Sequence, residues 1–169
     1  MTEVLLESAR GSLSEHGAFE RLREGYAVTT TAFDAAVHVR AAGDAVSYRV
    51  VVTVPTLDAV VEGEEVAPVI REGWFETFER RVKHPGGATR IDPAEPVVTL
   101  DVDAGEVHVE IGFETTSPAK GTEDAKALVD FVEGTYLQGV VPGYDYRDPV
   151  AGLIQQAEDR SQGEGGPPI

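Results

Sequence analysis

Two histidines lie where a sheet could present them for acid–base or metal chemistry. His108 and Glu110 belong to a run of alternating apolar and polar residues, so both side chains occupy one face of a predicted strand. His38 occupies the polar face of an earlier predicted strand, and we expect it to lie near His108 across the sheet. A metal site needs a third ligand, and none follows at a recognisable spacing. A solvated polar sheet face explains these residues better, and we predict neither a bound metal nor a cofactor.

Motifs for nucleophilic catalysis and for phosphate binding are missing from the sequence. The chain has no cysteine, which excludes thiol catalysis and disulfide bonds. It also has no G-x-S-x-G, no Walker loop and no G-x-G-x-x-G. We therefore assign no catalytic residue and favour a role other than that of an enzyme.

A basic cluster comprises Arg80, Arg81, Lys83, His84 and Arg90, around a Pro-Gly-Gly sequence at residues 85–87. At the predicted end of a helix, Arg80, Arg81, Lys83 and His84 complement the negative end of the helix dipole. The cluster is also a candidate anion-binding site, with Arg80, Arg81 and Lys83 as its binding residues. Both interpretations stay open at the level of the sequence.

The strongest candidate for a binding surface is an aromatic segment at residues 140–149, with the sequence VVPGYDYRDP. Tyrosine and arginine are typical of the residues that dominate protein interfaces. The candidate partner-binding residues are Tyr136, Tyr144, Asp145, Tyr146 and Arg147. The alternative is a loop packed onto the sheet, because a Pro-Gly pair followed by tyrosines also suits that role.

An amphipathic segment at residues 66–84 predicts the central helix of the fold. Pro68 suits its first turn, where the missing N–H is not needed, and the Pro-Gly-Gly sequence ends it. The apolar stripe comprises Val66, Val69, Ile70, Trp74, Phe75, Phe78 and Val82. Gly73 would let another element approach the helix closely. We expect the stripe, Trp74 and Phe78 above all, to pack against a sheet.

Period-two alternation flanks this helix and predicts two β-hairpins. The first pairs residues 33–40 with residues 48–54, and a short strand from residue 26 precedes it. The second pairs residues 98–102 with residues 107–113. We expect both hairpins to belong to one mostly antiparallel sheet.

Helical spacing predicts three further helices: one near the N-terminus, one capped by Thr122, and a short one after Asp148-Pro149. The predicted element order is α-β-β-(β)-α-β-β-α-α. We predict a single two-layer α+β domain over residues 1–160, with an antiparallel sheet of four to five strands and helices packed against it. Residues 161–169, SQGEGGPPI, predict a disordered tail.

A formal charge of −16, from 30 acidic and 14 basic residues, limits the classes of partner. Nucleic acid is disfavoured, because proteins grip it with Lys and Arg. An acidic excess with few lysines is typical of the haloarchaeal cytoplasm, where salt screens self-repulsion; a moderate-salt acidic protein is the alternative. No stretch approaches the roughly 20 apolar residues of a membrane span, and the N-terminal MTEVLLESARG carries acids where a signal peptide is basic. We expect a cytosolic protein that binds neither nucleic acid nor membrane.

Three motifs resemble a haloarchaeal protein family of unknown function: HGAFE at residues 16–20, FDAAVHV at residues 33–39 and VPGYDYRDP at residues 141–149. That resemblance implies no activity. The element order resembles the type III secretion chaperone-like fold, which implies binding of protein partners, often as a dimer. We therefore favour a non-catalytic, protein-binding or chaperone/adaptor-like domain whose partner is another protein or a second copy. The alternative is a small-molecule binding protein or enzyme that uses the polar sheet face around His38 and His108.

Overall fold

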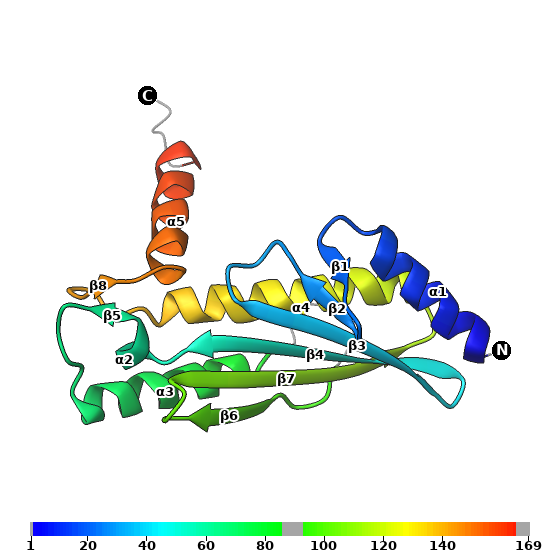
Figure 1. The fold of residues 1–169 in the computed structure, drawn as a ribbon, viewed down its shortest axis with the longest axis horizontal. Helices are drawn as coiled ribbons and strands as arrows, with labels where there is room; N and C mark the ends of the chain where they lie inside the picture. Colours follow the sequence, from blue (N-terminus) through cyan, green and yellow to red (C-terminus); the bar gives the residue numbers. More distant parts are fainter. Residues whose placement is uncertain (1, 86–92, 165–169) are drawn as a thin grey trace.

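A six-stranded antiparallel sheet forms the centre of the protein in a computed structural model that describes residues 2–85 and 93–164 (Figure 1). Its strands are β1 (Phe19–Arg21), β2 (Tyr26–Val28), β3 (Asp34–Ala42), β4 (Ala45–Pro55), β6 (Val97–Asp101) and β7 (Glu106–Thr115). They follow the order β1-β2-β3-β4-β7-β6, and each neighbouring pair is antiparallel. The predicted α+β fold with one antiparallel sheet is confirmed, although the sheet has six strands rather than four or five.

Alternation in the central strand separates the two faces of the sheet. The inward residues Val46, Tyr48, Val50, Val52 and Val54 are all 0% exposed. Between them, Arg49, Val51 and Thr53 point to the opposite face and are exposed or half-buried. β4 pairs with β3 on one side and with β7 on the other, so its inward side chains lie in the middle of the core.

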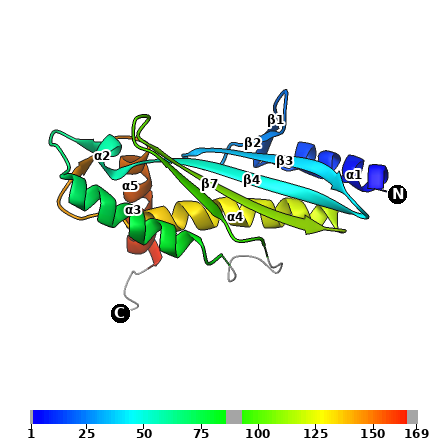
Figure 2. The same ribbon diagram turned by 90° about the horizontal axis from the view of Figure 1, so that it is seen from below.

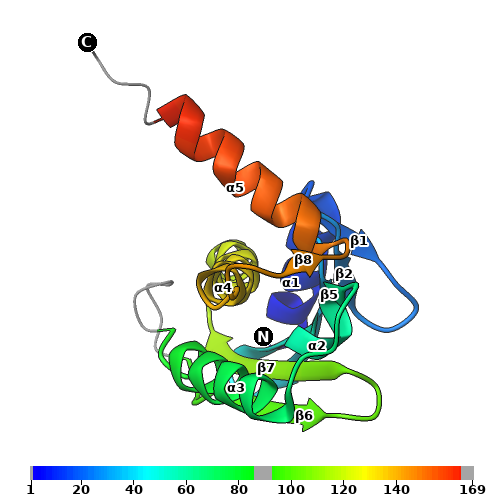
Figure 3. The ribbon, with the colours of Figure 1, turned by 90° about the vertical axis from the view of Figure 1, so that its left-hand side faces the viewer.

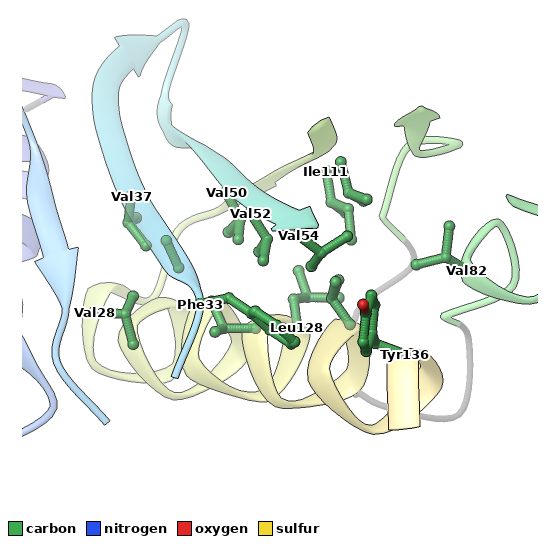
Figure 4. Close-up of a cluster of buried hydrophobic side chains, with 14 of the residues drawn as sticks. Val28, Phe33, Val37, Val50, Val52, Val54, Val82, Ile111, Leu128 and Tyr136 are labelled. Carbon is green, nitrogen blue, oxygen red and sulfur yellow. The ribbon is translucent and has the colours of Figure 1, made fainter. Parts of the chain in front are cut away.

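Three helices enclose the inward face: α1 (Thr2–Glu15), α3 (Pro68–Val82) and α4 (Pro118–Gln138), with the short α2 (Leu57–Val60) before α3 (Figure 2). Helical spacing gives α4 one buried stripe. It comprises Ala125, Leu128, Val129, Val132 and Tyr136. Figure 4 shows Leu128 and Tyr136 rising from α4 towards the valines of the sheet. Apolar residues at helical spacing thus meet apolar residues at strand spacing to form one core.

The stripe of α3 is only partly buried. Trp74, Phe78 and Val82 are at most 5% exposed, whereas Val69 is 72% and Ile70 is 40% exposed. The first turn of the helix therefore lies beyond the core, and the prediction that Val69 and Ile70 are buried is wrong. Gly73 has no atom within 4 Å of where its Cβ would lie, so the predicted close approach of another element is also absent.

α4 begins at Pro118, about one turn earlier than predicted. Proline suits the first helical turn because it has no N–H to satisfy, and that start extends the helix. Thr122 is consequently inside the helix and is not its cap. Its hydroxyl donates to the carbonyl oxygen of Pro118 at 3.2 Å and lies 2.7 Å from Ser12 Oγ of α1.

The C-terminal helix, α5 (Val150–Glu164), stands away from the rest of the molecule (Figures 1 and 3). Val150 and Leu153 at its base are buried, while residues 155–160 are all exposed. The helix continues past residue 160, where the domain was predicted to end; residues 165–169 of the predicted tail lie outside the described residues. None of the helices in the described ranges has the length and apolar content to cross a membrane.

Candidate functional site

The tyrosine loop, residues 140–149, is held to the segment before α3. Its strand β8 (Asp145–Tyr146) pairs antiparallel with β5 (Val61–Glu62). The amide of Arg147 donates to the Val60 carbonyl at 2.8 Å, and the Tyr146 hydroxyl donates to the Val141 carbonyl at 2.6 Å. These bonds fix a loop that would otherwise be free, and they set the direction in which α5 leaves it.

The tyrosines and the charged residues of the loop differ in their exposure. Tyr144 and Tyr146 are half-buried and pack against the core, while Asp145 and Arg147 are exposed. Burial raises the pKa of the Tyr146 phenol. The tyrosines thus anchor the loop, and the charged residues remain available to a partner.

Tyr136 is placed in the core and not on this surface. It is 1% exposed, and its ring lies edge-on to those of Phe33, Trp74 and Phe78 at centroid distances of 4.9, 5.7 and 6.0 Å. Its hydroxyl points away from α4 into the core and has no hydrogen-bond partner among the described residues (Figure 4). The prediction that Tyr136 belongs with the four loop residues is therefore corrected, since its position in the stripe of α4 buries it.

A cleft of about 750 Å³ opens beside the tyrosine loop, between α4 and the projecting α5. The residues that line this α4–α5 cleft are Thr30, Thr31, Ala32, Lys126, Asp130, Glu133, Gly134, Leu137, Asp148, Pro149, Gly152, Leu153, Gln156 and Arg160. Lys126 pairs with Asp130 at 2.6 Å, and Glu133 accepts a hydrogen bond from the Ala32 amide at 3.3 Å. The cleft therefore offers both signs of charge beside the apolar side chains of Leu137, Pro149 and Leu153.

The histidines of the open sheet face do not meet. His38 lies opposite Arg49 on β4, whereas His108 lies opposite Thr53 on the same strand. Four residues along a strand span about 13 Å, so the prediction that the two histidines are neighbours is wrong. His108 Nδ1 is 3.0 Å from Thr53 Oγ1, and its Nε2 is 3.4 Å from Glu106. In the described part of the chain, no three His, Asp or Glu side chains are placed to share a metal ion.

The predicted basic cluster is divided by the structure. Arg80 and Arg81 line a groove of about 620 Å³ between the end of α3 and α4, together with His84 and Phe131. Lys83 lies apart from that groove, 3.6 Å from Glu79. The groove therefore brings together Arg80, Arg81 and His84 of the predicted cluster, whereas Arg90 lies outside the described residues.

A second arginine-lined cleft was not predicted from the sequence. Arg10, Arg21 and Arg23 line it with His38, at the end of the β1–β2 hairpin. The local signal is the short spacing of Arg21 and Arg23, because Arg10 and His38 come from separate elements.

Comparison with known proteins identifies the family but no activity. No curated protein and no solved structure is significantly similar to this chain. Residues 14–156 match the profile of a family of unknown function (DUF5813), which covers all the elements of the sheet. The expectation of a family without an assigned activity is confirmed: the chain belongs to DUF5813.

Proposed function

We propose that this protein is a non-catalytic binding domain whose partner is a polypeptide seated in the α4–α5 cleft. One observation carries the proposal: α5 is held only at its base, so its outer turns and the cleft beneath them are left without a partner in the described chain. Isolated helices are marginal in water, and most helical stability comes from packing. Because α5 projects from the fixed tyrosine loop and its outer turns lack packing partners, it is suited to docking onto another polypeptide.

The chemistry of the cleft fits a helical segment of a second copy of the chain. Lys126, which is paired with Asp130, and Arg160 are basic groups at the cleft, and Glu133 and Asp148 are further carboxylates there. The outer part of α5 carries Glu158, Asp159 and Arg160, so both surfaces offer groups of both signs. When α5 of each copy docks into the α4–α5 cleft of the other copy, the two copies form a closed dimer with two-fold symmetry. The resemblance to the chaperone-like fold, whose members bind proteins and often dimerise, supports the same conclusion.

Truncation after Ile154 tests this proposal, because it keeps the buried Val150 and Leu153 and removes the exposed residues 155–160 with the end of the helix. We expect light scattering to give a dimer mass for the full chain and a monomer mass for the truncated one, with matching melting temperatures. Lys126→Glu should weaken the dimer, whereas Lys120→Glu, an exposed position of α4 outside the cleft, should not. A full chain that stays monomeric at all concentrations and salts rejects the second copy. Capture of another protein that depends on residues 155–164 would then identify a different polypeptide.

A small-molecule role is the second candidate, and one cleft favours it. A hollow of about 460 Å³ on the open sheet face is lined by His38, Arg49 and Glu110, among others. Arg49 and Glu110 form an ion pair at 3.0 Å. His108 does not line this hollow, so a role for both histidines in one site has no support from the geometry.

We also infer a cytosolic, high-salt setting of the haloarchaeal kind. The charge of −16 supports this inference, since an acidic surface stays soluble where salt screens its self-repulsion.

A further inference from the structure

We propose that the cleft at the β1–β2 hairpin, the hairpin cleft, binds a small molecule that carries a multivalent oxyanion, with a phosphate as the expected group. The cleft has a volume of about 420 Å³ and receives side chains from α1, the hairpin and β3. The residues that carry the argument are Arg10, Arg21, Arg23, Gly25, Tyr26 and His38. This site is separate from the α4–α5 cleft and does not depend on its function.

The first reason is the sign of the charge. Three arginines and one carboxylate, Glu24, line the hairpin cleft, in a chain with 30 acidic and 14 basic residues. Arg10 is paired with Glu7 at 3.1 Å. Within the described residues, neither Arg21 nor Arg23 takes part in an ion pair. A chain with a twofold excess of acids leaves these guanidinium groups unneutralised at a hollow, where an anionic ligand would neutralise them.

The second reason is that the hairpin is fixed in place. The amide of Leu22 donates to the Gly25 carbonyl at 2.9 Å and closes the turn. Gly25 has a φ of +87°, and a Cβ on it would lie 2.6 Å from His38 Nδ1, so the turn rests directly on the histidine ring. The hydroxyl of Tyr26 donates to the Arg10 carbonyl at 3.3 Å, which ties the hairpin to α1. A preorganised site loses little entropy when a ligand binds.

The size and chemistry of the cleft define the ligand class. A guanidinium group presents paired N–H donors that match two oxygens of a phosphate. The volume falls in the range of small-molecule sites, roughly 300–1,000 Å³. Leu22, which is 44% exposed, adds an apolar wall beside the arginines. A phosphorylated small molecule with an apolar portion therefore fits better than inorganic phosphate alone.

A neighbouring hollow adds one further arginine. The hollow on the open sheet face shares His38 and Val39 with the hairpin cleft and adds Arg40, whereas its Arg49 is paired with Glu110 and Glu95 also lines it. Arg40 is exposed and, like Arg21, takes part in no ion pair with the described residues. A ligand with two separated anionic groups could reach from one hollow to the other past His38.

Calorimetric titration of the full chain with pyrophosphate tests the proposal, with citrate as a polycarboxylate and a single-stranded oligonucleotide as comparison probes. We expect saturable binding of pyrophosphate. Arg21→Gln combined with Arg23→Gln should weaken it by about tenfold or more, because it removes charge-assisted hydrogen bonds. Arg80→Gln with Arg81→Gln removes the same charge at the competing candidate anion site, the groove between α3 and α4, and shows whether the binding belongs to that groove. Lys120→Gln, at an exposed position that lines none of the clefts described, is the neutral control and should leave the affinity unchanged. Amide chemical shifts of residues 21–26 and His38 should move on titration.

The outcomes separate the alternatives. Equal binding of citrate and pyrophosphate, still lost with Arg21 and Arg23, would keep the site and broaden its ligand to any multivalent oxyanion. Binding that is lost in the Arg80 and Arg81 variant instead would overturn the assignment and favour the other groove. No saturable binding of pyrophosphate or citrate, or binding of the oligonucleotide alone, would reject a small-molecule site.

Discussion

Gly121 of α4 lies directly against the phenol ring of Tyr48 in β4: a Cβ on the glycine would lie 2.5 Å from Tyr48 Oη. The Tyr48 ring is fully buried and stacks on Phe113 at a centroid distance of 4.7 Å. Its hydroxyl donates to the Pro118 carbonyl at 3.3 Å. The absence of a side chain at Gly121 thus sets how closely the helix approaches the sheet.

Gly121→Ala should therefore destabilise the fold even though alanine is the better helix former. The added methyl group has to displace a packed aromatic ring, and overpacking of this kind costs about 1–3 kcal/mol. Gly134→Ala is the matched control, since Gly134 is exposed in the same helix with no atom within 4 Å of its Cβ position. It should stabilise the protein by about 0.5–1 kcal/mol. Denaturant unfolding measures both, and a Gly121→Ala protein as stable as the wild type would contradict the contact.

Tyr136→Phe should leave the free energy of unfolding unchanged or raise it by about 1 kcal/mol. The buried hydroxyl of Tyr136 has no hydrogen-bond partner among the described residues. On folding it loses its hydrogen bonds to water without replacement, and its removal abolishes that cost. Tyr48→Phe is the contrasting variant, because that hydroxyl donates to the Pro118 carbonyl, and its loss should cost about 0.5–1.5 kcal/mol. If Tyr136→Phe is the more damaging of the two, a buried water or ligand holds that hydroxyl.

Trp74→Ala should cost about 3–5 kcal/mol, as expected for a large ring removed from a core. Trp74 is 5% exposed and lies parallel to the Phe78 ring at a centroid distance of 5.7 Å. Val69→Ala on the same helix should cost under about 0.5 kcal/mol, since Val69 is 72% exposed. Chemical unfolding followed by circular dichroism compares them, and similar losses at both positions would mean that α3 packs differently.

Stability should fall at alkaline pH because of the buried tyrosines. Burial, followed by the nearby Asp124 carboxylate, raises the pKa of Tyr48 from 10.0 to about 12, and burial also raises the pKa of Tyr136. The unfolded chain then releases these protons at a lower pH than the folded chain. The stabilisation is complete below about pH 10 and is lost as pH rises towards 12, by about 1.4 kcal/mol per pH unit for each tyrosine.

Unfolding free energies measured across this alkaline range, together with phenolate absorbance, test the assignment. Tyr48→Phe should reduce the loss of unfolding free energy per pH unit by the contribution of one tyrosine. A wild-type protein whose stability does not change above pH 10 would show that neither phenol is shielded from solvent.

Salt should stabilise the protein. With a charge of −16, self-repulsion in the folded chain is strong in dilute buffer and is screened as potassium chloride rises to molar concentration. The melting temperature should increase over that range. Sucrose at equal osmolality is the control, since it adds no ions. A melting temperature that stays flat or falls in potassium chloride would argue against the proposed high-salt setting.

The sheet is predictable from the sequence because burial of one face imposes a period of two. Tyr48, Val50, Val52 and Val54 share the inward face for that reason, and all four are buried, whereas Arg49, Val51 and Thr53 between them are exposed or half-buried. Helix boundaries are harder to predict, because Pro118 and Thr122 are both plausible starts and local chemistry does not rank them. Apolar spacing likewise shows which side chains share a face of α3, but not how far the core extends along it.

Sites that are assembled from distant segments cannot be predicted from such local sequence patterns. Arg10, Arg21 and His38 lie in three elements that only the folded sheet and α1 bring to one cleft. The expected approach of His38 to His108 fails because the registers of β3 and β7 on β4 are independent of each other. Residues of the tyrosine loop are close in sequence, so their grouping was predictable, whereas the anchoring of the loop to β5 was not.

The pairing of β4 with β7 has a consequence for the chain while it is being synthesised, because β4 is made well before β7. Thr53 and its partner His108 are separated by 55 residues, and β7 covers one whole edge of β4. Until β7 has been synthesised, the most apolar strand of the protein has an unpaired edge, which is the usual template for aggregation. The nascent N-terminal half therefore exposes the edge of its most apolar strand until β7 follows.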